Sequence, residues 1–179
     1  MLESLPGKDS WKASMGYLIR KTQSPDCLNR CGSLKNLYLN TPNLKTLYFH
    51  GPRGKPCTIE LINCKKLMNL HLVGVAMNTT MFVNCNESFP LLQMLTLAGC
   101  AMSGCINISS NSLHELWFIG FNKPMGLTID APNVSSFKYN GIAPYQNINL
   151  PRVAIAYVEL YPNLNQKREC DFRMWPNQL

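Results

Sequence analysis

The chain has 179 residues, of which 46% are hydrophobic and 15% are charged. This length suits one domain with a buried core, and the composition excludes a wholly disordered chain. No apolar run is long enough to span a bilayer, so we expect no membrane contact.

The net charge of +7 lies in the first third of the chain. Residues 1–66 hold eleven Lys or Arg and four Asp or Glu, whereas residues 67–179 hold six of each kind. A basic end can steer an acidic partner toward a neutral body. The basic residues form no dense cluster, so nucleic acid is not an expected partner.

Residues 1–33 precede the repeated part of the chain, and we treat them as an N-terminal cap or remnant segment. Charged residues lie where a signal peptide would need an apolar segment, so we expect a cytoplasmic location, a nuclear location or both. The stretch "WKASMGYLIRK", residues 11–21, predicts a short helix that covers the core of the first repeat.

One spacing of apolar residues recurs from residue 34 onward: an apolar residue, another three positions later, and a third two positions after that. Copies begin at Leu34, Leu44, Leu67, Leu92, Leu113 and Val134, with a weaker copy at Val153. From Leu44 onward the starts are 23, 25, 21, 21 and 19 residues apart, which is typical of leucine-rich repeats.

A shorter apolar-x-apolar pair precedes most copies, and turns rich in Pro, Asn and Gly separate the two. The pairs are Ile59 and Leu61, Met81 and Val83, Ile106 and Ile108, Leu127 and Ile129, and Ile148 and Leu150. We therefore predict a mainly β fold with little regular helix. It is a right-handed leucine-rich-repeat solenoid of about six irregular repeats of 19–25 residues, over residues 34–160, followed by a C-terminal tail at 161–179.

Eight cysteines occur, but none in a CxxC pair. "CLNRC" at 27–31 and "CAMSGC" at 100–105 lack zinc-ligand spacing and a nearby histidine pair, so we expect reduced, mostly buried thiols and no metal or cofactor. Cys100 lies three residues past Leu97, where leucine-rich repeats often place Asn or Cys to bond the turn backbone.

Three phrases carry a resemblance to a family: "LNTPNLKTLYFHG" (39–51), "LINCKKLMNLHLVGV" (61–75) and "LTIDAPNVSSFKYNG" (127–141). They resemble the leucine-rich repeats of plant F-box proteins, including the F-box/FBD type, and the resemblance covers about residues 33–160. It implies that the repeats bind the substrate of a cullin ubiquitin ligase, while an F-box docks on the Skp adaptor. No F-box is recognisable in residues 1–33 and no FBD domain in the tail, so the resemblance is to the repeat region alone.

In a leucine-rich repeat, the residues between the core positions of each main strand point to the concave face. This rule gives one column: Tyr48, His71, Thr96, Trp117, Lys138 and Tyr157. Trp and Tyr are enriched at binding hot spots, so we predict that a protein substrate or partner binds there. Ordinary aromatic packing on a β-surface explains the same residues equally well.

Three other kinds of protein are alternatives to the substrate-binding part of a ligase. A stand-alone repeat scaffold without a ligase connection fits the same pattern. Four N-glycosylation sequons, at Asn78, Asn86, Asn107 and Asn133, would suit an extracellular receptor-type repeat, although Asn is also a common turn residue. No GxSxG, HExxH, P-loop or GxGxxG motif occurs, so we do not expect an enzyme.

Overall fold

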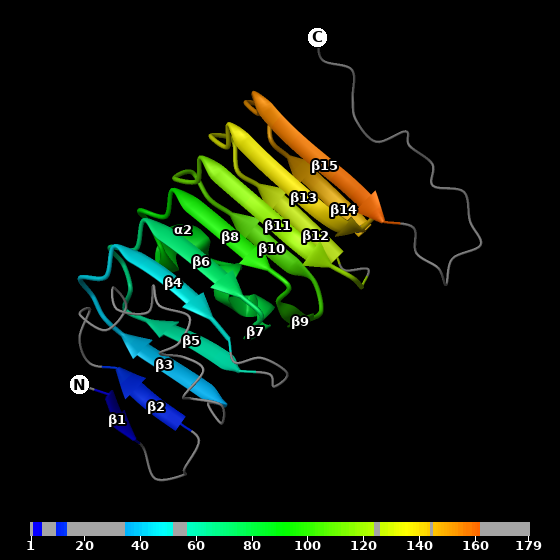
Figure 1. The fold of residues 1–179 in the computed structure, drawn as a ribbon. Coiled ribbons are helices and arrows are strands. Elements are labelled where there is room, and N and C mark those ends of the chain that lie inside the picture. The colour runs from blue at the N-terminus through cyan, green and yellow to red at the C-terminus, as the bar shows by residue number, and fades with distance from the viewer. Residues whose placement is uncertain are drawn as a thin grey trace.

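The computed structural model describes residues 2–4, 10–13, 35–51, 57–123, 126–143 and 145–161. They form a mainly β, parallel solenoid with little helix, as predicted (Figure 1). The solenoid has about five turns, where the sequence predicted about six repeats. Among these residues, no helix has the length and apolar character needed to cross a membrane.

Six strands, one from each copy of the apolar spacing from Leu44 onward, form one parallel sheet, here called the main sheet. In spatial order they are β4 (Thr46–His50), β6 (Asn69–Val73), β8 (Met94–Ala98), β11 (Glu115–Phe121), β13 (Ser136–Ile142) and β15 (Ile155–Tyr161). Equivalent residues of successive copies are direct cross-strand partners, as Leu70 with Leu95 and Leu95 with Leu116. The sequence repeat is therefore also the register of the sheet.

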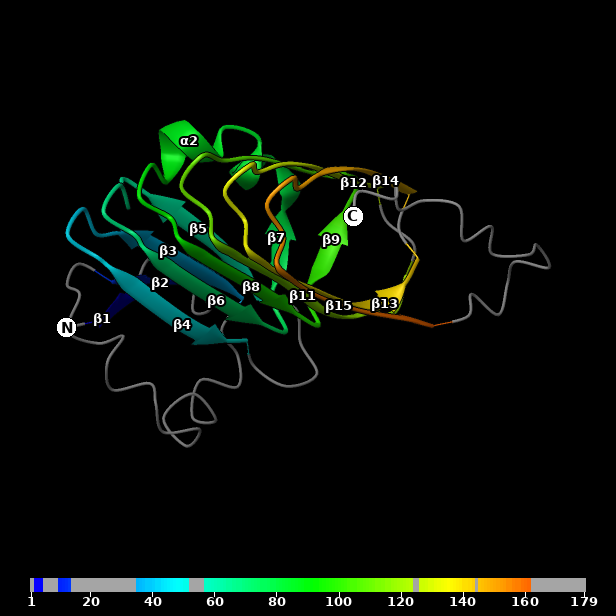
Figure 2. The same cartoon turned by 90° about the horizontal axis from the view of Figure 1, so that it is seen from above.

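A second wall of strands, each of three to five residues, lies behind the main sheet. One sheet has the order β1 (Leu2–Ser4), β2 (Ser10–Ala13), β3 (Asn36–Asn40), β5 (Thr58–Ile62), β7 (Ala76–Asn78) and β9 (Ala101–Ser103). Another has the order β10 (Ile106–Ser109), β12 (Gly126–Asp130) and β14 (Tyr145–Asn149). Figure 2 shows β12 and β14 across the solenoid from β13 and β15.

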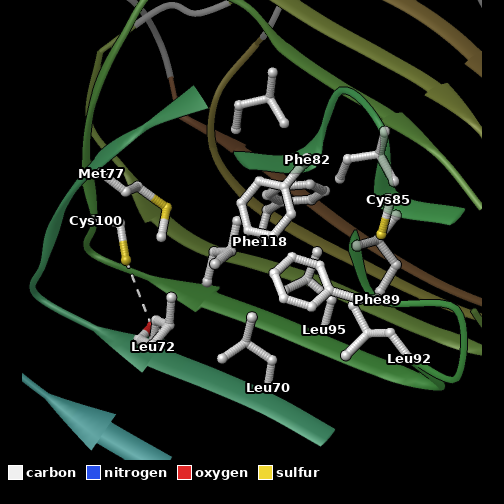
Figure 3. Packing of buried hydrophobic residues seen from close by; sticks show 14 of the residues in the cluster. Leu70, Leu72, Met77, Phe82, Cys85, Phe89, Leu92, Leu95, Cys100 and Phe118 are labelled. Atoms are coloured by element: carbon white, nitrogen blue, oxygen red, sulfur yellow. Dashed lines mark hydrogen bonds between the residues drawn. The ribbon is translucent and has the colours of Figure 1, made fainter. Parts of the chain in front are cut away.

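The core fills the space between the two walls. Along each main strand from β4 to β13, two alternate side chains point inward and are at most 4% exposed, such as Leu47 and Phe49 in β4. Phe82 and Phe89 enter from the turns and meet Phe118 and Leu95 at the middle of the core (Figure 3). Each such fully buried side chain contributes roughly 1.5–3 kcal/mol to folding.

Most of the cysteines that the structure describes are buried, as predicted. Cys57, Cys64, Cys85 and Cys100 are free and buried, while Cys105 is free and exposed. The Cys100 thiol has its single proton within reach of two carbonyl oxygens, that of Leu72 at 3.5 Å and that of Ala98 at 3.6 Å, which lie on two main strands (Figure 3). Cys27, Cys31 and Cys170 lie outside the described residues.

The copy that begins at Leu34 is assigned wrongly by the sequence pattern. Its strand, β3, pairs in parallel with β5 and belongs to the second wall, with Leu37 opposite Ile59 and Leu39 opposite Leu61. The ten residues from Leu34 to Leu44 are too few for a full turn of this solenoid, so both apolar segments belong to the same turn. Leu37 and Leu39 therefore form the short apolar-x-apolar pair that precedes the copy at Leu44.

The segment with Met81 and Val83 is also not a strand. Residues Thr79–Phe82 form a 3-10 helix, η2, and Cys85–Ser88 form a short α-helix, α2. The Asn78 side chain caps η2 by accepting the Thr80 N–H at 3.1 Å. This turn carries the longest interval between copies, and the extra residues coil beside β10 while delivering Phe82 and Phe89 to the core.

The helix expected at residues 11–21 is contradicted where the structure describes it. Trp11, Lys12 and Ala13 belong to strand β2, which pairs antiparallel with β1 and parallel with β3. The backbone groups of these residues are therefore used between strands rather than within a helix. The rest of that prediction, residues 14–21, and the tail at 162–179 lie outside the described residues.

We predict that Leu95→Asp abolishes cooperative unfolding. Leu95 is fully buried in β8 with main strands on both sides, so the variant places an unpaired carboxylate at the centre of the core. The cost exceeds about 3 kcal/mol, a large part of the stability of a small domain. A circular-dichroism melt measures it, with the exposed neighbour Gln93→Asp as control. A wild-type melt for Leu95→Asp would contradict the described packing.

Candidate functional site

The six predicted column residues lie in one row across the main sheet. Cross-strand register places Tyr48 opposite His71, His71 opposite Thr96, and Thr96 opposite Trp117. The row continues from Trp117 to Lys138 and from Lys138 to Tyr157. For the first five, the strand neighbours on either side are buried core residues, so these five side chains point away from the core. Tyr157 lies opposite Lys138 in register and therefore points to the same side of the sheet. We call this row the outer column and the surface around it the outer face.

The first part of the outer column is a cluster of three rings. The Tyr48 and His71 ring centroids are 5.6 Å apart, and the His50 and His71 rings stack at 6.0 Å. Partial burial lowers the pKa of His71, and the neighbouring His50 lowers it further. His71 therefore favours its neutral form, in which the ring offers both a donor and an acceptor.

The centre of the outer column is buried although it belongs to the outer face. Thr96 is only 1% exposed, because the larger side chains of His71 and Trp117 stand directly beside it on the adjacent strands. Neither the Thr96 hydroxyl nor the Trp117 indole N–H has a hydrogen-bond partner within the described part of the chain. Two buried polar groups without partners cost stability at the middle of this face.

The last part of the outer column belongs to a polar cluster. The Lys138 ammonium lies 4.9 Å from the centroid of the Tyr157 ring, a cation–π contact. The Tyr157 hydroxyl donates to Glu159 Oε2 at 3.3 Å, and the Asn140 amide donates to Glu159 Oε2 at 2.6 Å and to the Tyr161 hydroxyl at 2.7 Å. The charge of Glu159 raises the pKa of Tyr157, so this phenol keeps its proton.

Tyr161 is the member of this cluster that the sequence did not reveal. It lies two residues beyond Glu159 on the same face of β15, which runs to Tyr161 without a break. The available signal was the alternation of Ile155, Tyr157, Glu159 and Tyr161 along the strand. This alternation continues beyond Val158, the last position of the repeat spacing from which the column was defined.

Three of the four sequon asparagines form hydrogen bonds in the turns. Asn78 caps η2, and Asn86 accepts the backbone N–H of Asn111 at 2.9 Å. The Asn133 amide donates to the Asn111 carbonyl at 2.7 Å, and its oxygen accepts from Arg152 at 3.1 Å. Asn86 and Asn133 therefore join turns of successive repeats, whereas Asn78 acts within one turn.

The outer face combines aromatic and polar side chains. It offers aromatic rings, an imidazole pair, a lysine and a network around one carboxylate. Among the described residues, no group of three or more His, Cys, Asp or Glu is arranged to hold a metal ion. Burial raises the pKa values of Cys57 and Cys85 to about 11, so these thiols are protonated and packed rather than reactive.

We predict that Thr96→Val raises the free energy of unfolding by about 1 kcal/mol, because valine has the same shape without the unpartnered hydroxyl. Urea titration measures the change. Thr46→Val is the matched control, since the Thr46 hydroxyl accepts from Asn69 Nδ2 at 3.3 Å and its loss brings no gain. A lower stability for Thr96→Val would show that the hydroxyl has a partner in solution.

We also predict that stability falls as the pH drops below about 6.5. The folded state lowers the pKa of His71 from its ordinary value of 6.5, so the unfolded chain binds the proton more tightly. The loss begins at the ordinary pKa and grows until the pH reaches the folded pKa. His71→Gln should flatten this pH dependence, whereas His114→Gln, outside the ring cluster, should not. Equal slopes for both variants would exclude His71 as the source.

Comparison of the chain with models of protein families, with curated proteins and with solved structures found no match. The repeat register and the outer face are therefore the observations on which a functional proposal rests.

Proposed function

We propose that the protein is a protein-interaction module that binds its partner on the outer face of the main sheet. The observation that carries the proposal is the outer column itself, six side chains held in one register row over six parallel strands. A rigid scaffold that presents a continuous row of side chains is what repeat proteins use to bind extended or folded partners.

The composition of the row supports a protein as the partner. Tyr48 is 45% exposed and Tyr157 is 52% exposed, at opposite ends of the row, and the partly exposed Trp117 lies between them. Large aromatic side chains on a rigid strand lose little conformational entropy on binding and dominate many interfaces. The half-buried Lys138 and the Glu159 cluster supply polar contacts at the rim.

We further propose that the partner is a substrate presented to a cullin-type ubiquitin ligase in the cytoplasm or nucleus. The support is the resemblance to the repeats of plant F-box proteins, whose phrases coincide with structural units of this solenoid. In "APN", Ala131 is fully buried and Asn133 bonds to the turn of the preceding repeat. In "TPN", Thr41 is buried and Asn43 accepts from Lys66 of the next turn at 3.0 Å.

We predict that Trp117→Ala and Tyr48→Ala weaken partner binding. A hot-spot aromatic contributes about 2 kcal/mol, so each variant should bind about 30-fold more weakly. Affinity capture from cell extract identifies candidate partners, and calorimetry with the purified partner measures the change. Ile62→Ala is the matched control, because Ile62 is 46% exposed but lies on β5 of the second wall. A partner that loses affinity equally with Ile62→Ala does not use the outer face.

Binding to a purified Skp adaptor separates the ligase subunit from a stand-alone scaffold. Association of the full chain with the adaptor, unaffected by Trp117→Ala, supports the ligase role. Absence of association at micromolar concentration, with partner binding to the outer face retained, favours the scaffold. Absence of both adaptor association and partner binding to the outer face overturns the proposed function.

A further inference from the structure

The last strand of the main sheet is open along its edge. Every residue of β15 is exposed, and its inward-pointing Val158 and Leu160 are 40% and 39% exposed. In the preceding strand, the inward-pointing Phe137 and Tyr139 are each 2% exposed. Within the described part of the chain, no further strand covers the apolar core of the solenoid at this end.

The opposite edge of the main sheet differs. The inward-pointing residues of β4, Leu47 and Phe49, are 2% and 4% exposed, although β4 also pairs with only one strand of the sheet. An unpaired strand edge therefore does not by itself expose the core in this molecule. Among the described strands, β15 combines a backbone edge that pairs with no further strand and inward-pointing apolar side chains that are exposed.

Most of the features that protect an edge strand are missing from β15. Proteins commonly shield such an edge with charged side chains, especially lysine, with proline or with a bulge. Residues Ile155–Tyr161 contain one charged residue, Glu159, and no Lys, Arg or Pro, and their register with β13 runs over seven residues without a shift. By contrast, the register between β11 and β13 shifts between Ile119 and Phe121. The edge is thus a regular pairing surface with little protection.

We infer that β15 is a self-association surface, on which a second copy of this chain pairs antiparallel about a two-fold axis through Val158. This register is the one that pairs all seven residues of β15. Residues that face each other across the two strands are then both even-numbered or both odd-numbered. Even-numbered residues of β15 point toward the core and odd-numbered ones away from it, so each pair lies on one side of the sheet. The two main sheets join into one, with their cores on the same side.

The side chains of β15 are complementary to themselves in this register. On the core side, Val158 meets Val158 of the other copy, and Ala156 meets Leu160. On the outer side, Tyr157 meets Glu159, so the phenol that donates to Glu159 within one chain at 3.3 Å has an equivalent carboxylate opposite it. The remaining pair, Ile155 with Tyr161, joins an aliphatic and an aromatic side chain.

Other registers are less favourable on the same grounds. A shift by one residue would turn the apolar side of one copy to the outer side of the other. An axis through Glu159 would place two carboxylates directly opposite each other. An axis through Tyr157 would leave Leu160 and Tyr161 unpaired. The second wall is also consistent with a second copy as the partner. Its strand β14 is the last of its sheet, and the second copy would cover the partly buried Ile148 and Leu150 there.

The test is a site-specific cross-link in the full chain. Val158→Cys places two thiols directly opposite each other, with Cβ atoms about 5 Å apart, close to disulfide distance. Ile155→Cys is the matched control, because its two copies would lie about 20 Å apart along the paired strands. Both are made with Cys27, Cys31, Cys105 and Cys170 replaced by serine, which leaves only cysteines buried in the core. Mild oxidation and a non-reducing gel give the readout.

We expect wild-type protein to elute as a dimer in size-exclusion chromatography with light scattering, and Val158→Cys alone to form a covalent dimer. Val158→Lys, which opposes two ammonium groups, should be monomeric with an unchanged circular-dichroism spectrum. A wild-type monomer up to about 100 µM with no cross-link would overturn the inference, leaving residues 162–179 or another protein as occupants of the edge. Equal cross-linking at both positions would also overturn it. None of these outcomes depends on whether the outer face binds a partner.

Discussion

The structure depends on the fact that no single turn of this chain can bury its own apolar side chains. Each main strand presents two inward side chains, and these are covered only when equivalent residues stand above and below them. Stacking therefore requires one register throughout the sheet, as in the sequence Leu70, Leu95 and Leu116. The outer column follows from the same requirement, because the residue between two aligned core positions is aligned as well.

The alternation of buried and exposed positions explains which parts of the fold the sequence predicted. The recurring spacing identified the six main strands and placed Tyr48 through Tyr157 in one row, since spacing and register are the same property here. It misassigned the Leu34 copy because β3 has the same local pattern as a main strand, and only pairing with β5 distinguishes them. Met81 and Val83 alternate like a strand, yet the longer interval allows η2 and α2 to form there.

The character of the site depended on neighbours that no local pattern specifies. The sequence does not show that Thr96, in the outer column, is covered by His71 and Trp117. Nor does it show that Asn140 joins Glu159 and Tyr161, because those hydrogen bonds require β13 and β15 to be adjacent. The outer face therefore has a tightly packed centre, where Thr96 is buried, and a polar end around Glu159.

The glycines that follow the main strands have a consequence for the shape of the outer face. Gly74 and Gly99, with φ values of 62° and 55°, end strands of five residues by adopting a left-handed conformation. In β13 the chain continues past Gly141 to Ile142, and in β15 Leu160 takes the position opposite Gly141. In β11, Gly120 keeps a positive φ of 72°, and the strand reaches Phe121 through a register shift beside β13. The last three strands have seven residues each, so the sheet widens along the chain. A repeat is lengthened where its chain passes the position of the glycine turn, and the surface is broadened at one end while the register of its core stays unchanged.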